Sequence, residues 1–104
     1  MLTPVAKLTD VPNGTLLAVT LPGGEAVCVA NVGGEVRAFT DRCPHAAFPM
    51  SAGELLADGT VLCAWHGARF DARTGAVVEG PACDPLAVFA VRVAGGEIFV
   101  EGSE

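Results

Sequence analysis

Two short cysteine–histidine pairs constrain this chain more than any other feature of its sequence. The first pair lies in C-P-H at 43–45 and the second in C-A-W-H at 63–66, and seventeen residues, 46–62, separate them. His45 and His66 are the only histidines of the chain. Thiolate and imidazole groups are the preferred protein ligands of zinc and of iron–sulfur clusters. The pattern therefore predicts a metal centre held between two loops.

The order of the ligands bears on which metal is bound. Two thiolates and two imidazoles suit a tetrahedral zinc ion, or a two-iron cluster with cysteine on one iron and histidine on the other. A zinc finger usually groups its cysteines as one pair and its histidines as another. Here each loop supplies one residue of each kind, which favours a diiron cluster clamped between the loops. A structural zinc module that binds other proteins is the alternative.

The same stretch resembles the cluster-binding motif of Rieske proteins, C-x-H, a gap, and C-x-x-H. Further matches to that family are S-A-G at 51–53, H-G-A-R-F-D at 66–71, T-G at 74–75 and G-P-A followed by P-L within 80–86. The resemblance extends from about Val5 to Val100. Ala64 departs from it, because the family often has Pro there, but that position supplies no ligand atom.

The resemblance implies one Rieske-type [2Fe-2S] cluster as the cofactor. Its implied ligands, which are also the predicted metal-binding residues, are Cys43, His45, Cys63 and His66. The residues expected to surround the cluster and to form a docking tip are Pro44, Ala46, Phe48, Trp65, Gly67 and Pro81. The side chain of Trp65 suits either the core or an exposed contact surface, since exposed Trp often anchors interfaces.

Two further cysteines lie outside the motif. Cys28 stands between two valines in an expected strand and is predicted to be a buried apolar thiol. Cys83 is predicted to be a spare loop thiol. A disulfide between them is not expected, because residues 1–12 show no secretory signal pattern and a reducing cytoplasm disfavours disulfides. We therefore expect the protein in the cytoplasm.

Composition limits the fold and the partners. A chain of 104 residues predicts one domain, and thirteen glycines with seven prolines predict the many turns of an all-β fold. The net charge of -6 argues against nucleic acid and anionic lipid as partners. No window of 18 apolar residues suggests a membrane span.

Alternating hydrophobic residues and turn signals predict the strands. Expected strands lie at residues 4–10, 15–21, 26–32, 35–40, around 55, 60–62, 69–72, 76–79, 86–94 and 97–101. One short helical turn is expected within 46–58. The result is a Rieske-like antiparallel β sandwich or barrel, with a base at 1–42 and 83–104 and an inserted cluster-binding subdomain at 43–82.

The resemblance implies a function in electron transfer. Small stand-alone Rieske proteins resemble the ferredoxin components of bacterial aromatic-ring-hydroxylating dioxygenase systems. We therefore expect a soluble one-electron carrier between a flavin-dependent reductase and a terminal oxygenase. A small subunit of a nitrite reductase is the alternative within the same fold. An oxygenase is not expected, because its mononuclear iron needs two more histidines.

The high-potential Rieske proteins of respiratory complexes are similar to this chain but carry features that it lacks. They place a Ser two residues after the second histidine and a Tyr four residues after it, where this chain has Ala68 and Phe70. They also have two extra cysteines, at the positions of Phe48 and Trp65, which form a disulfide. Each hydrogen bond donated to a cluster sulfur stabilises the reduced cluster. The resemblance therefore predicts a low reduction potential.

Overall fold

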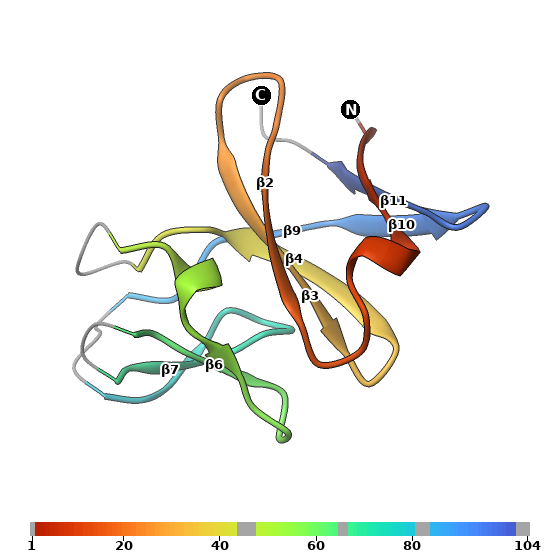
Figure 1. The fold of residues 1–104 in the computed structure, drawn as a ribbon. Coiled ribbons are helices and arrows are strands. Elements are labelled where there is room, and N and C mark those ends of the chain that lie inside the picture. Colours follow the sequence, from red (N-terminus) through yellow and green to blue (C-terminus); the bar gives the residue numbers. More distant parts are fainter. Residues whose placement is uncertain (1, 44–47, 65–66, 81–83, 102–104) are drawn as a thin grey trace.

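The computed structural model describes residues 2–43, 48–64, 67–80 and 84–101 (Figure 1). Within these residues the chain forms three antiparallel sheets and two 3-10 turns, which confirms the all-β prediction. Neither turn in this part of the chain has the length and apolar character needed to cross a membrane.

Two of the sheets are built from the ends of the chain. Sheet A has the order β1-β11-β10 and sheet B the order β2-β3-β4-β9. The strands of sheet A are β1 (Leu2–Lys7), β10 (Val91–Ala94) and β11 (Glu97–Glu101). Those of sheet B are β2 (Leu16–Thr20), β3 (Ala26–Val32), β4 (Glu35–Thr40) and β9 (Val88–Phe89).

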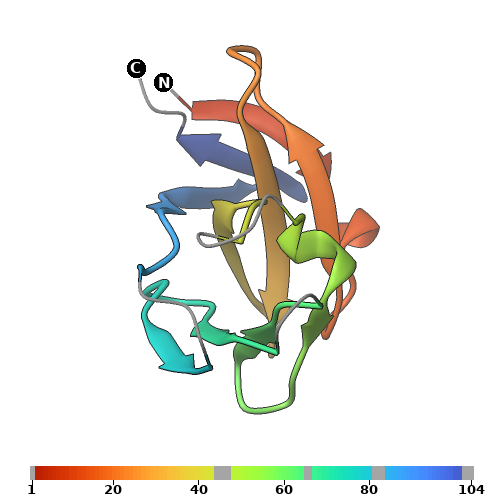
Figure 2. The same ribbon diagram turned by 90° about the vertical axis from the view of Figure 1, so that its left-hand side faces the viewer.

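Sheet C is formed by the middle of the chain and lies beside sheet B (Figures 1 and 2). Its order is β5-β6-β7-β8, and each of its strands is short. The strands are β5 (Glu54–Leu55), β6 (Thr60–Leu62), β7 (Arg69–Asp71) and β8 (Val77–Glu79). All of them fall inside the segment 43–82 that carries the cysteine–histidine pairs.

Strand β3 has both faces buried, and this explains its run of apolar residues. Successive side chains of a strand point to opposite faces of the sheet. Val27 and Val29 therefore pack with Ile98 and Val100 of sheet A in one hydrophobic cluster. Cys28 and Ala30 belong to a second cluster, on the side of sheet C. Sheet B is thus the middle layer of the molecule.

The strand predictions at 26–32, 35–40 and 97–101 are confirmed to the residue. The prediction that the first strand runs to Asp10 is wrong, because Leu8–Asp10 forms a 3-10 turn, η1. The Asp10 carboxylate accepts a hydrogen bond from the Lys7 amide at 3.0 Å, which bends the chain back before Pro12. The short helical turn expected within 46–58 is present as η2 (Met50–Ala52).

The single strand predicted at 86–94 is also wrong. The chain breaks at Ala90, so that β9 joins sheet B and β10 joins sheet A. Thr40 donates to the carbonyl of Ala87 at 2.9 Å, and Glu101 donates to that of Ala90 at 2.9 Å. The alternation of residues continues through the break, because Phe89 and Val91, both partly buried, pack against the same hydrophobic cluster on either side of it. A period of two therefore does not reveal that a strand changes sheets.

Gly53, the residue before β5, lies close to the backbone of Leu62 in β6. A Cβ atom at Gly53 would overlap the backbone carbonyl of Leu62, which a side-chain movement cannot relieve. We expect Gly53→Ala to lower the free energy of unfolding by about 1–3 kcal/mol, the usual cost of overpacking. Gly23→Ala is the matched control, since a Cβ there meets no atom within 4 Å. Urea unfolding of both variants measures the difference, and equal stabilities would contradict the close approach.

Candidate metal centre

The two cysteine–histidine loops are closed in the same way. The Cys43 amide donates to the carbonyl of Phe48 at 2.8 Å, and the Cys63 amide donates to the carbonyl of Ala68 at 2.7 Å. Each bond therefore spans five residues and begins at a cysteine. His45 and His66 fall inside these two loops in sequence, but both lie outside the described residues. The structure thus presents two matched loops, each rooted at a predicted ligand.

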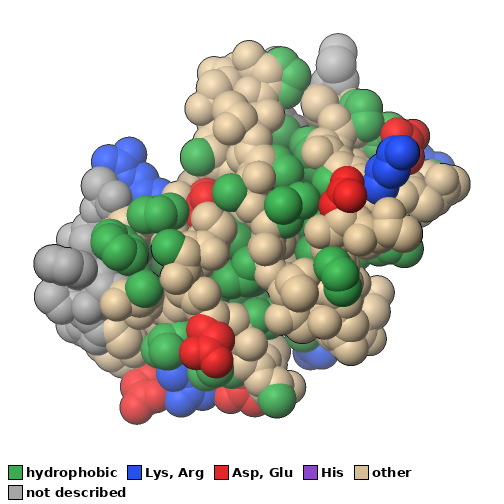
Figure 3. Space-filling view, viewed as in Figure 1, with side chains coloured by type: hydrophobic (Ala, Val, Ile, Leu, Met, Phe, Trp, Pro, Cys, Tyr) green, Lys and Arg blue, Asp and Glu red, His purple; other side chains and the backbone are tan. Residues whose placement is uncertain are grey.

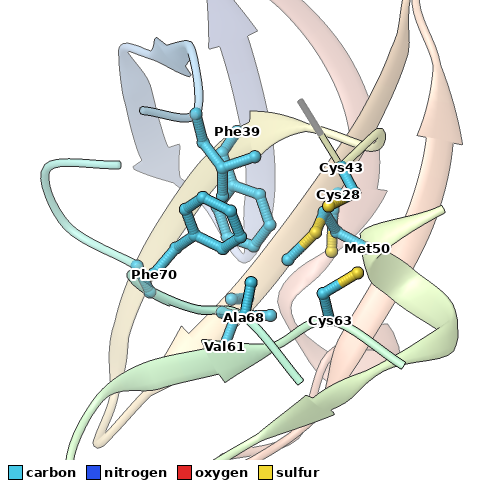
Figure 4. Close-up of a cluster of buried hydrophobic side chains, with 11 residues drawn as sticks. Cys28, Phe39, Cys43, Met50, Val61, Cys63, Ala68 and Phe70 are labelled. Atoms are coloured by element: carbon cyan, nitrogen blue, oxygen red, sulfur yellow. The ribbon is translucent and has the colours of Figure 1, made fainter. Parts of the chain in front are cut away.

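Both cysteines are buried in one hydrophobic cluster (Figure 4). Figure 4 shows the sulfur-bearing side chains on one side of this cluster and the rings of Phe39 and Phe70 on the other. The cluster, called the shared core below, comprises Cys28, Ala30, Phe39, Cys43, Met50, Val61, Cys63, Ala68, Phe70, Ala72 and Leu86. Its members come from sheet B, from sheet C and from the loops, so both ligand loops are anchored on the same packed interior.

Close backbone approaches fix the loops relative to each other. Gly53 ends the 3-10 turn after the first loop and lies against Leu62, which precedes Cys63. Gly80 has a φ of 104°, and a Cβ there would lie 2.6 Å from the Cα of Ala68. Only glycine fits such a position without a backbone shift. These contacts connect the exit of the first loop to the entrance of the second, and the end of β8 to the second loop.

A carboxylate braces the root of the first loop, and the sequence reasoning missed it. The Ser51 amide donates to Asp41 Oδ1 at 2.6 Å, and the Ser51 hydroxyl donates to Oδ2 at 2.7 Å. The Asp41 amide donates to Ala26 of sheet B at 3.0 Å. The sequence offered one signal for this contact: Asp41 stands two residues before Cys43, and Ser51 of S-A-G follows the first loop. The sequence analysis used that serine only as part of the S-A-G match and predicted no hydrogen-bond partner for it.

Cys28 is completely buried in the shared core, as predicted. Burial raises the pKa of its thiol far above the ordinary value, the negative charge of Asp41 raises it further, and a backbone hydrogen bond from Leu17 opposes both. The thiol is therefore neutral at physiological pH and behaves as a small apolar side chain. Cys28 and Cys63 form no disulfide within the described residues, and Cys83 lies outside them.

Charged side chains pair at the outer end of sheet C, where Figure 3 shows acidic and basic groups side by side. Arg69 donates from Nη2 to Asp58 at 2.8 Å and from Nη1 to Glu79 at 2.6 Å. The hydroxyl and amide of Thr60 lower the pKa of Asp58, and the charge of Arg69 adds to this effect. These exposed pairs connect β7 to β8 and to the turn before β6, and each is expected to stabilise only weakly.

The predicted tip residues are only partly within the described part of the chain. Phe48 packs against the shared core, half-buried, and Gly67 is exposed. Pro44, Ala46, Trp65 and Pro81 lie outside the described residues. No group of three potential metal-binding side chains occurs in the part of the chain that the structure describes, a part that includes neither histidine.

The residues present suit an iron–sulfur cluster. Two buried thiols from matched loops converge on one apolar core, and the sequence places one histidine in each loop. Thiolates are the usual ligands of [2Fe-2S] clusters, and in Rieske centres two histidines replace two of them. Ala68 and Phe70 are fully buried, and neither has a hydroxyl group to donate to a cluster sulfur.

Comparison with known families and sequences supports this reading of the site. The model of the Rieske [2Fe-2S] domain matches residues 1–90. The chain is 44% identical over 95 residues to the 3-phenylpropionate/cinnamic acid dioxygenase ferredoxin subunit of Escherichia coli K12. This match covers 90% of the chain and 87% of the relative.

Solved structures show the same fold. The ferredoxin of carbazole 1,9a-dioxygenase from Nocardioides aromaticivorans IC177 superposes with a TM-score of 0.93 at 32% identity, over 99% of both chains. A chain from a complex of reduced oxygenase and oxidized ferredoxin in carbazole 1,9a-dioxygenase gives a TM-score of 0.92 at 32% identity. That match covers 99% of this chain and 94% of the other.

Proposed function

This chain belongs to the Rieske [2Fe-2S] domain family, and we propose that it is a one-electron carrier serving a ring-hydroxylating dioxygenase. Its cofactor is one Rieske-type [2Fe-2S] cluster, which when bound accepts and returns a single electron. The observation that carries the proposal is the pair of matched loops, each beginning at a buried cysteine of the shared core. The likeness to dioxygenase ferredoxins extends over nearly the whole chain.

The proposed ligands are Cys43 and Cys63 on one iron and His45 and His66 on the other. The amide hydrogen bonds at the two cysteines hold the loops closed. Met50 and Phe70, both fully buried, exclude water from the interior side of the site. We also propose that 43–82 is the cluster-binding subdomain and that 1–42 and 83–104 form its base, with the docking tip at the residues named above.

The proposed partners follow from the related proteins. Relatives are named as ferredoxin subunits of a dioxygenase, and one solved complex contains an oxygenase and a ferredoxin. We infer a terminal oxygenase as electron acceptor and a flavin-dependent reductase as donor. We also propose that the protein works in the cytoplasm, because a reducing compartment favours cysteines as metal ligands over disulfides. Both histidines of the chain are assigned to the cluster, so none is left for the mononuclear iron of an oxygenase.

A reconstituted electron-transfer chain tests both the function and the ligands. The purified protein is combined with NADH and with the reductase and oxygenase of the 3-phenylpropionate system, and product formation is measured. We expect the rate to rise with the concentration of the carrier. Alanine at Cys43, His45, Cys63 or His66 abolishes the rise and the bound iron, because two bridged irons need two terminal ligands each.

Cys28→Ala is the matched control, because Cys28 is as deeply buried as the two proposed thiolate ligands. We expect this variant to keep its iron and its transfer rate and to lose only about 1 kcal/mol of stability through lost packing. Full visible absorption in Cys43→Ala would contradict the ligand assignment. Electron delivery to a nitrite reductase, with none to the oxygenase, would favour the alternative of a nitrite reductase subunit.

The reduction potential is a separate prediction. The side chains of Ala68 and Phe70 have no hydroxyl group to donate to the cluster, and the net charge of -6 disfavours an added electron. We expect a midpoint on the order of -150 mV, at the low end of the Rieske range. Voltammetry at neutral pH measures it. A midpoint above roughly +100 mV, in the upper part of that range, would contradict both the hydrogen-bond argument and the dioxygenase assignment.

A further inference from the structure

Asp41 is a charged residue that nothing in the proposed electron transfer has yet used. It follows β4 directly and stands two residues before Cys43. Its carboxylate is partly buried and accepts two hydrogen bonds from Ser51, at 2.6 and 2.7 Å. These two bonds hold the carboxylate, and with it its negative charge, at the base of the first ligand loop.

The position of this charge is fixed from both sides. The Asp41 amide donates to Ala26 of sheet B at 3.0 Å. Ser51 is the central residue of η2, whose first residue, Met50, is fully buried in the shared core beside Cys43 and Cys63. The Asp41–Ser51 contact therefore joins the two ends of the first loop outside the Cys43–Phe48 hydrogen bond. The carboxylate cannot turn away from the loop without breaking both bonds to Ser51.

None of the ion pairs found among the described residues includes Asp41. The neighbouring Arg42 is exposed, where water and salt screen its charge. Burial raises the pKa of Cys28 in the shared core, and the negative charge of Asp41 raises it further. The field of Asp41 therefore reaches the shared core. A carboxylate near a redox centre disfavours the addition of an electron to that centre.

We propose that Asp41, held by Ser51, is a positioning and potential-determining residue of the cluster site, which lowers the reduction potential through its fixed charge. This proposal rests on the proposed function and deepens it. The predicted low potential then has two sources in this chain: the missing hydroxyl donors at Ala68 and Phe70, and a negative charge at the base of the first loop.

Substitutions at Asp41 and Ser51 separate the effect of the Asp41 charge from that of its hydrogen bonds to Ser51. Asp41→Asn keeps the shape and one hydrogen-bond acceptor but removes the charge, and Asp41→Ser removes it with a shorter side chain. Asp41→Glu keeps the charge. Ser51→Ala keeps the charge and removes one hydrogen bond of the brace. Glu97→Gln removes an equal charge from exposed β11 in sheet A, on the other side of sheet B from the shared core.

Voltammetry of each cluster-loaded variant is the test, after the wild-type spectrum has shown that a Rieske cluster is bound. We expect Asp41→Asn and Asp41→Ser to raise the equilibrium constant for reduction of the cluster about tenfold. For one electron this is a rise of about 59 mV in the midpoint potential. Asp41→Glu and Glu97→Gln should stay near the wild-type midpoint. Ser51→Ala should also stay near it but release iron to a chelator several times faster than the wild type.

Two results would overturn the proposal. In the first, the midpoint potentials of Asp41→Asn and Asp41→Ser shift from the wild-type value by no more than that of Glu97→Gln does. In the second, both Asp41→Asn and Asp41→Ser lose the cluster, which would assign Asp41 a purely structural role. Absence of a Rieske spectrum in the wild-type protein would instead contradict the proposed function itself, so the two failures are distinguishable.

Discussion

Burial of Cys43 and Cys63, the two proposed thiolate ligands, in one hydrophobic core is the interaction on which the rest of this structure depends. Strand β3 makes it possible by supplying side chains to two interiors at once. Val27 and Val29 join sheet A to sheet B, while Cys28 and Ala30 face the segment that carries the ligands. The short strands of sheet C could not bury a site alone, because a few two- and three-residue strands enclose little apolar surface. They pack instead against sheet B.

Backbone contacts then convert this packing into a defined geometry. The cysteine amides close the two loops, Gly53 lies against Leu62, and Gly80 lies against Ala68. Carbonyl and Cα atoms cannot rotate away as side chains do, so these contacts fix the distance between the loops. A redox centre benefits from such rigidity, because it must bind the same irons in two charge states. The Asp41–Ser51 brace adds a charge to the same framework.

Much of this could be predicted from the sequence, for identifiable reasons. The strands at 26–32, 35–40 and 97–101 each begin shortly after a pair of glycines, so a local signal indicated where they start. The ligand motif was recognisable because both histidines of the chain stand beside cysteines. The change of sheet at Ala90 left no local signal, since the alternation continues through it. The partnership of Asp41 with Ser51 joins residues ten apart through a loop, and residue types alone do not indicate such a contact. The positions of His45 and His66 remain predictions.

The central claim is that two imidazoles and two thiolates bind one diiron cluster, and pulsed electron paramagnetic resonance tests it most directly. The purified protein is reduced with dithionite, and the nitrogen couplings of the paramagnetic cluster are measured. We expect strong couplings from two directly bound histidine nitrogens, because the family places the added electron on the histidine-ligated iron. A reduced cluster without strongly coupled nitrogen, or a colourless zinc protein without a signal, would contradict the account.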